Sequence, residues 1–233
     1  NFIIIMSNTI TIISLNQEYV DLAKKAGFKN VHNMRIQEYR PIRKNVFYVS
    51  PANALGFMDG GIDMDLSRVI MPDIEKTLKR DIRKYGKTTL LGRKYLPIGS
   101  SIICEPDKRD VYLHYLKEKN CHLISAPTML LPQDVSNTEN CYYACMASLY
   151  NVFVNCKYDN AEVIFTSMAC GYGNMTSQQS FTQFINALKN YKNYKPSKVI
   201  DRCVLHEPNL DEQPLYYENT EWKNIEPNDI IIK

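Results

Sequence analysis

Two loops contain the residues whose types and spacing could bind a phosphorylated ligand. The first loop follows the apolar run Asn45–Ser50 and contains Asn53, the pair Gly60 and Gly61, and Asp63. Glycine adopts a positive φ without strain and lets backbone amides approach a ligand closely. Amides at the start of a helix attract phosphate oxygens, and an asparagine side chain both donates to and accepts from a hydroxylated ligand. The alternative for one such loop is a tight strand-to-helix turn.

The second loop repeats this arrangement later in the chain. It follows the apolar run 161–166 and brings Gly171 and Gly173 in front of a helix that we expect to begin near Ser177. Two such loops at adjacent strand ends could hold both phosphates of a diphosphate. The pair therefore predicts a diphosphate site more strongly than either loop alone.

Other side chains in these loops could take part in acid–base or thiol chemistry. Asp59 and Asp63 are candidates for a pair of carboxylates, and the alternative is that both acids interact with a helix N-terminus. Cys170 precedes a glycine near a helix N-terminus, a position that could lower the pKa of its thiol. For Cys170 we favour small-residue packing, because no partner histidine can be placed from the sequence.

Strands and helices that could position these loops alternate along most of the chain. Apolar runs predict strands at 10–14, 31–34, 45–50, 98–104, 121–126, 161–166 and 199–205, and helical periodicity predicts helices at 17–26, 62–85, 111–119, 136 to about 154, and 177–190. Pro72 interrupts the helical region 62–85, and Ser136–Glu139 is a capping-box pattern. The alternation predicts an α/β fold, a three-layer α/β/α sandwich with a mixed central sheet. Ligands bind such sheets at the carboxyl ends of the strands, where both loops lie.

The composition is that of an average globular protein. The 233 residues carry 28 Lys and Arg against 25 Asp and Glu, a net charge of +3, and 45% of them are hydrophobic. These values argue against a disordered chain and against a dedicated nucleic-acid binder with a strongly basic surface. No apolar run approaches the roughly 20 residues that span a bilayer, and residues 1–6 lack the basic start and cleavage site of a signal peptide. We therefore expect no membrane partner.

The numbers and spacing of cysteines and histidines indicate whether the compartment is reducing and whether the chain could bind a metal ion. The seven cysteines are odd in number, lie in apolar stretches and include no Cys-x-x-Cys pair. They predict free thiols in a reducing intracellular compartment, the cytoplasm or the nucleus. The four histidines lack the i,i+4 spacing of a helical metal site. We therefore expect no metal and no cofactor.

Charge is concentrated in two segments. The stretch Lys76–Lys94 holds eight basic residues against Asp81 and could bind RNA or poly-ADP-ribose. A solvated helix face is the interpretation that we favour for it. Residues 206–233 carry seven acids against two lysines. We expect these residues to form an acidic C-terminal extension that packs on a body formed by residues 1–205.

Taken together, the two loops resemble those of the macro domain, an ADP-ribose-binding α/β/α module. Ser50-Pro-Ala-Asn53 is similar to the Asn-Ala-Ala-Asn of that family, and Gly60-Gly-Ile-Asp63 is similar to its Gly-Gly-Val-Asp. Ala169-Cys-Gly171-Tyr-Gly173 resembles its second phosphate loop, Gly-Thr-Gly-x-Gly. The resemblance covers residues 8–205, and the string from Ser50 to Asp63 looks like a microbial or viral branch of the family.

The resemblance implies a ligand and a set of site residues. The ligand would be ADP-ribose or an ADP-ribosylated protein, bound by a monomer. The enzymatic activity would be hydrolysis of a mono-ADP-ribose linkage on a protein or of an ADP-ribose derivative. Asn53 and Asp63 would orient or activate the attacking water. The implied ligand-binding residues are Ala52, Asn53, Gly60, Gly61 and Ile62 in the first loop, and Ala169, Cys170, Gly171, Tyr172 and Gly173 in the second.

Three departures from the family pattern keep other functions open. Arg35 stands near the place of an aspartate that reads adenine, and an arginine cannot accept a hydrogen bond from the adenine amino group. Ser50-Pro51 replaces Asn-Ala, and Asp59 adds a negative charge beside a phosphate loop. The alternatives are a non-catalytic reader of ADP-ribose or of another nucleotide, and RNA or poly-ADP-ribose binding through Lys76–Lys94.

Overall fold

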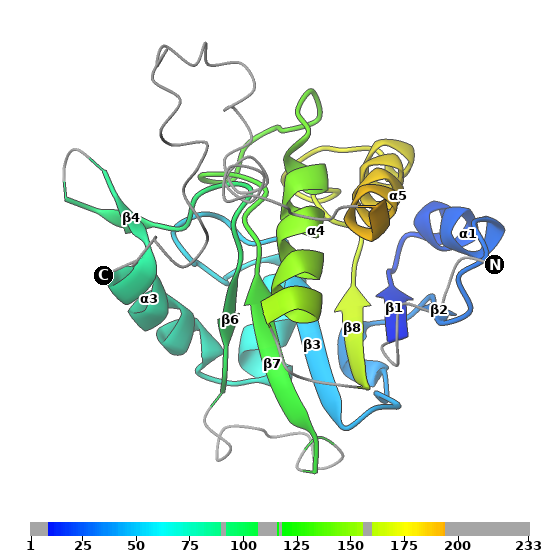
Figure 1. The fold of residues 1–233 in the computed structure, drawn as a ribbon, viewed down its shortest axis with the longest axis horizontal. Helices are drawn as coiled ribbons and strands as arrows, with labels where there is room; N and C mark the ends of the chain where they lie inside the picture. The colour runs from blue at the N-terminus through cyan, green and yellow to red at the C-terminus, as the bar shows by residue number, and fades with distance from the viewer. Residues whose placement is uncertain (1–8, 90–91, 107–115, 117, 156–159, 194–233) are drawn as a thin grey trace.

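A mixed six-stranded sheet forms the centre of the protein, with strand order β2-β1-β8-β3-β7-β6 (Figure 1). The computed structural model describes residues 9–89, 92–106, 116, 118–155 and 160–193. The strands of the sheet are β1 (Thr9–Ile13), β2 (Val31–His32), β3 (Asn45–Ser50), β6 (Ile102–Cys104), β7 (Asn120–Ser125) and β8 (Ala161–Phe165). Neighbouring strands are parallel except for β6 and β7. The parallel strands therefore present their carboxyl ends at one common edge.

Helices connect the strands and cover both faces of the sheet. They are α1 (Gln17–Lys25), α2 (Gly61–Asp65), α3 (Ile74–Tyr85), α4 (Asn140–Tyr150) and α5 (Ser177–Asn193), with short helical turns η1 (Ile36–Glu38), η2 (Leu66–Ile70) and η5 (Asn151–Asn155). A hairpin of β4 (Lys87–Thr88) and β5 (Lys94–Tyr95), which the sequence analysis did not predict, follows α3.

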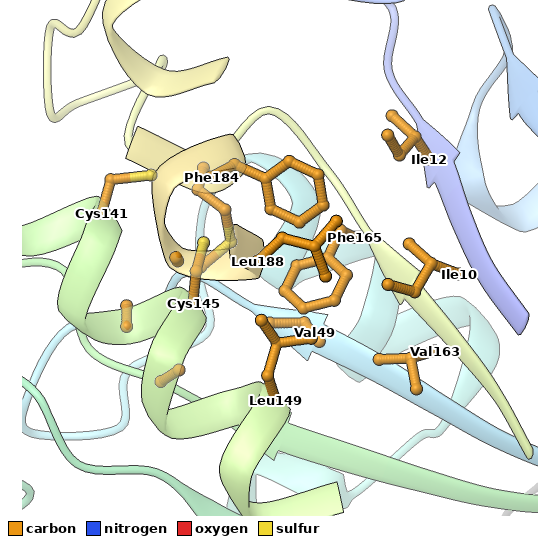
Figure 2. Close-up of a cluster of buried hydrophobic side chains, with 14 of the residues drawn as sticks. Ile10, Ile12, Val49, Cys141, Cys145, Leu149, Val163, Phe165, Phe184 and Leu188 are labelled. Carbon is orange, nitrogen blue, oxygen red and sulfur yellow. The ribbon is translucent and has the colours of Figure 1, made fainter. Parts of the chain in front are cut away.

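Alternating side chains of the central strands pack on opposite faces, which explains the two helical layers. In β3, Phe47 and Val49 join the core beneath α1, α4 and α5, whereas Val46 and Tyr48 join the core beneath η2 and α3. Figure 2 shows the first of these cores, in which side chains of α4 and α5 meet those of the strands. The expected three-layer α/β/α sandwich with a mixed sheet is confirmed.

Two local features differ from a simple helix prediction. The region 62–85 is divided, because α2 and η2 end before Pro72 and Asp73 adopts a φ of 64° ahead of α3. The capping-box prediction at Ser136–Glu139 was wrong: α4 begins at Asn140, and Glu139 makes no capping bond. The amide of Tyr142 instead donates to Oε1 of Gln183 on α5. A tertiary contact therefore provides the acceptor for an amide in the first turn of α4.

Several expectations concern residues outside the described ranges. They include most of the helix expected at 111–119, the strand expected at 199–205 and the extension 206–233. None of the helices in the described residues is long and apolar enough to cross a membrane.

Candidate functional site

A cavity of about 460 Å³ opens at the carboxyl ends of the parallel strands. Its walls come from the segments that follow β1, β2, β3, β7 and β8. The lining residues are Ile13, Ser14, Leu15, Met34, Arg35, Ile36, Pro51, Asn53, Phe57, Asp59, Gly60, Gly61, Ile62, Asp63, Met64, Asp65, Met129, Pro132, Thr166, Ser167, Ala169, Gly171, Tyr172 and Gly173. The cavity is within the size range of sites for nucleotide-sized ligands, and both glycine-containing loops contribute to it.

The first loop, between β3 and α2, is shaped by its own asparagine. Nδ2 of Asn53 donates to the carbonyl of Phe57 at 2.8 Å, and Oδ1 accepts from the amides of Leu55 and Phe57. The loop is also tied to the segment after β7, because the amide of Ala54 donates to the carbonyl of Met129 at 2.9 Å. Asn53 therefore lines the cavity with a side chain whose position is set by the turn that it closes.

The two loops meet across the cavity at Gly60 and Tyr172. A Cβ added to Gly60 would lie 3.1 Å from Cε2 of Tyr172, so the aromatic ring rests against the glycine backbone. The ring is otherwise open to solvent, with 72% of Tyr172 exposed. Gly61 adopts a φ of 54°, which a residue with a side chain adopts only with strain. The contact with Tyr172 explains the need for glycine at position 60, and the positive φ explains it at position 61. The ring of Tyr172 also gives the cavity an aromatic edge.

The second loop, between β8 and α5, turns so that several amides remain available. Ala169 has a φ of 59°, and its carbonyl accepts from the amide of Met175 at 3.1 Å. A Cβ on Gly173 would lie 2.5 Å from that carbonyl oxygen, so the turn requires a glycine there. Among the described residues, none accepts a hydrogen bond from the amides of Gly171, Tyr172 or Gly173. Consecutive amides of this kind can receive an anion.

Two residues expected to bind ligand lie outside the lining. Ala52 is fully buried, and its carbonyl accepts from the amide of Thr128 at 3.1 Å. The Sγ of Cys170 lies 3.6 Å from the carbonyl of Met168. Burial raises the pKa of the Cys170 thiol to about 11, which favours the packing interpretation over a reactive thiolate.

Asp63 is the most perturbed acid of the cavity wall. Its Oδ1 accepts a hydrogen bond from Oγ of the fully buried Ser50 at 2.5 Å. The pKa of Asp63 is raised to about 7, mainly by burial and also by the negative charges of Asp59 and Glu75, while the hydrogen bond from the Ser50 hydroxyl opposes the shift. Asp63 is therefore divided between its acid and base forms near neutral pH, as a proton-transferring group requires.

Another part of the cavity lining is apolar, with one exposed cation. It is formed by Ile13 at the end of β1, by Leu15 after β1, and by Met34, Arg35 and Ile36 after β2. The sequence analysis singled out only Arg35 in this region. The rule that ligands bind at the carboxyl ends of parallel strands was the signal that could have identified the residues after β1.

The floor of the cavity contains a polar residue that the sequence analysis missed. Thr166 follows β8 and is 5% exposed, and its Oγ1 has no hydrogen-bond partner among the described residues. The neighbouring Ser167 accepts a hydrogen bond from Oγ of Ser14 at 3.1 Å, which links the ends of β8 and β1. Nothing in the sequence distinguishes these hydroxyls from ordinary strand-end residues.

The other candidate sites receive less support. In the basic stretch, Lys76 pairs with Asp73, Lys79 pairs with Glu75 and Arg80 pairs with Asp81. Such pairing is typical of a solvated helix face. Within the described ranges, no group of three or more His, Cys, Asp and Glu side chains is arranged to hold a metal ion.

Comparisons with known proteins give matches only among solved structures. No protein-family model matches the sequence, and no curated protein matches it. The chain is similar to a macrodomain from Oceanobacillus iheyensis with MES bound, at a TM-score of 0.47 and 14% identity, over 77% of this chain and 88% of that chain. It is also similar to a glycine-to-valine mutant of the Oceanobacillus iheyensis macrodomain with ADPR, at a TM-score of 0.35 and 14% identity, over 81% of this chain and 96% of that chain. The functional assignment therefore depends on the loops and the cavity of this chain.

Proposed function

We propose that the cavity binds ADP-ribose, free or attached to a protein, in the manner of the macro domains that its loops resemble. The observation that supports this most directly is the meeting of both glycine-containing loops on one cavity, with the ring of Tyr172 against Gly60. A nucleoside diphosphate sugar has the parts that such a cavity suits: a flat base, a central diphosphate and a hydroxylated sugar.

The amides of Gly171, Tyr172 and Gly173 would receive the diphosphate from one side. They belong to a turn that Ala169 and Gly173 hold in place, so binding would require little reorganisation of the backbone. Tyr172 would cover the part of the ligand nearest Gly60. Asn53 would act by maintaining the turn opposite, because both ends of its amide bond that turn.

We further propose that the site hydrolyses a mono-ADP-ribose linkage, with Asp63 as the general base. An ionised Asp63 would accept a proton from the water that attacks the sugar carbon, while the bond from that carbon to the modified side chain breaks and the released side chain takes up a proton from solvent. Ser50 would keep the carboxylate in place through its hydrogen bond to Oδ1. Because the pKa of Asp63 is about 7, kcat/KM should rise as the pH increases from 6 to 8. Asp63→Ala should abolish turnover while much of the affinity for ADP-ribose remains.

The main alternative is a reader that binds ADP-ribose without cleaving it. In a reader, Asp63→Ala would change affinity, and the wild type would show no turnover with any mono-ADP-ribosylated substrate. An ADP-ribosylated protein incubated with wild type and with Asp63→Ala separates the two functions.

Calorimetric titration with ADP-ribose, beside AMP and ribose-5-phosphate, tests the binding site itself. Gly171→Glu is the informative variant, because a Cβ there meets no atom within 4 Å and the fold should tolerate it. Gly171→Gln is the matched control for bulk without charge. We expect micromolar binding by the wild type, a smaller loss for Gln and a loss of at least about 100-fold for Glu, since a carboxylate would repel the diphosphate. Equal affinities in all three proteins would contradict the placement of the diphosphate.

A further inference from the structure

We propose that Arg35 makes the base end of the cavity selective for a nucleobase that presents hydrogen-bond acceptors, namely a 6-oxopurine such as guanine or hypoxanthine. This inference rests on the proposed function and extends it by naming the base. The base end is defined as the part of the cavity formed by Ile13, Leu15, Met34, Arg35 and Ile36.

The guanidinium of Arg35 is placed to bind a ligand. Arg35 lines the cavity and is exposed. Within the described ranges, neither an ion pair nor a hydrogen bond engages its guanidinium. Its backbone amide donates to Oε2 of Glu38 at 3.3 Å, a contact that fixes the start of η1 and the position of the arginine. The side chain therefore projects from an anchored backbone.

The charged residues that line the cavity come from two parts of the chain. The lining carboxylates are those of Asp59, in the loop after β3, and of Asp63 and Asp65, in α2. Glu38 is the acid nearest to Arg35 in the chain, and it is outside the lining. Arg35 thus gives the base end a strong donor, and none of the lining carboxylates belongs to the segments that follow β1 or β2.

The acceptors of Ser14, which lies between Ile13 and Leu15 in the chain, are already engaged. The carbonyl of Ser14 accepts from Nδ2 of Asn33 at 3.1 Å. The Oγ of Ser14 accepts from the amide of Asn16 at 3.0 Å and donates to Ser167. A base that needs acceptors from the protein would compete with these bonds, whereas a base that needs donors would meet the guanidinium.

The surrounding side chains favour a flat ring over an isolated anion. Ile13, Leu15, Met34 and Ile36 surround Arg35 with aliphatic groups and a thioether. Leu15 is 66% exposed and would lose that exposure against the face of a base. Arginine forms a bidentate pair with O6 and N7 of a 6-oxopurine, and adenine offers only N7 beside an amino donor.

Titration of the whole protein with GDP-ribose, IDP-ribose and ADP-ribose tests this inference. We expect GDP-ribose and IDP-ribose to bind at least about ten-fold more tightly than ADP-ribose. Arg35→Ala should bring the three affinities within about two-fold of one another, and Arg35→Asp should favour ADP-ribose. Arg93→Ala is the control, because Arg93 is an exposed arginine outside the cavity lining. It should keep the wild-type preference, and a thermal melt of each variant checks folding.

The outcomes separate this inference from the proposed function. Equal affinities for the three ligands, together with a loss of binding in Gly171→Glu, would overturn the base preference and leave the ADP-ribose site standing. Tighter binding of ADP-ribose 2′-phosphate than of GDP-ribose would assign Arg35 to a phosphate and also overturn it. Failure of all these ligands to bind would refute the proposed function together with the base preference.

Discussion

Replacing Asp63 with asparagine should stabilise the protein at alkaline pH, although Asp63 is the proposed catalytic base. Burial raises the pKa of this carboxyl from its ordinary value of 3.8 to about 7. A folded-state pKa above the unfolded value means that the folded protein holds the proton more tightly. Stability therefore falls as the pH rises from about 4 to about 7, and the penalty is constant above that range.

The size of the effect follows from the shift. At 1.36 kcal/mol per pH unit, a shift from 3.8 to about 7 corresponds to about 4 kcal/mol lost from the free energy of unfolding above pH 7. Asparagine has the shape of the protonated acid and still offers Oδ1 to the hydroxyl of Ser50. Asp63→Asn should thus exceed the wild type by up to about 4 kcal/mol at pH 8 and by less than about 1 kcal/mol at pH 4.

Urea unfolding at pH 4, 6 and 8 measures this difference directly. Asp65→Asn is the matched control, because it removes the same charge from the same short helix and from the same cavity wall. We expect its difference from the wild type to stay below about 0.5 kcal/mol at all three pH values. If Asp63→Asn is no more stable than the wild type at pH 8, the ionised carboxylate is not penalised by burial, and the reasoning about its pKa is refuted.

Two further predictions concern buried hydroxyls and a thiol. Thr166→Val should raise the free energy of unfolding by about 1 kcal/mol, because Oγ1 of Thr166 has no partner among the described residues. Thr11→Val should instead lower the free energy of unfolding by about 1.5–3 kcal/mol, because Oγ1 of Thr11 donates to the carboxylate of Glu162 at 2.7 Å. Urea unfolding of the two variants checks this, and changes of the same sign would contradict it. Cys170, with a thiol pKa of about 11, should react with iodoacetamide at pH 7.4 on the order of 100-fold more slowly than free cysteine, measured by peptide mass spectrometry. Labelling of Cys170 at the rate of free cysteine would show that its thiol is not buried.

The sequence alone determined several local elements of the fold and the positions of the two glycine-containing loops. β-Branched runs predicted β3 and β8 to within one residue, because strand formation here follows from contiguous apolar side chains. The helix expected at 17–26 forms as α1 (Gln17–Lys25), and Gly27 follows its C-cap residue Ala26 with a φ of 88°. Pro72 was expected to divide a helical region, because proline lacks an amide hydrogen, and the division occurs there.

The tertiary structure decided how the charged and polar residues are used. Glu162 lies in an apolar strand, and the residues beside it in the sequence do not explain why an acidic residue is present there. In the fold it is fully buried and accepts from the hydroxyls of Thr11 and Tyr39 and from the amide of Ile42, each at 2.7 Å. Those donors are more than 100 residues away in the chain, so no local pattern could have identified them.

The same limit applies to the candidate site. The sequence identified the two glycine-containing loops, since glycine at a strand end has a local conformational cause. It did not reveal that the ring of Tyr172 rests on Gly60 or that Ser50 donates to Asp63. Those contacts arise because β3 and β8 pair in parallel and present their carboxyl ends at one edge of the sheet. Strand order and register are set by the packing of side chains distant in the chain, and they place a half-protonated acid, a set of loop amides and an arginine around one cavity.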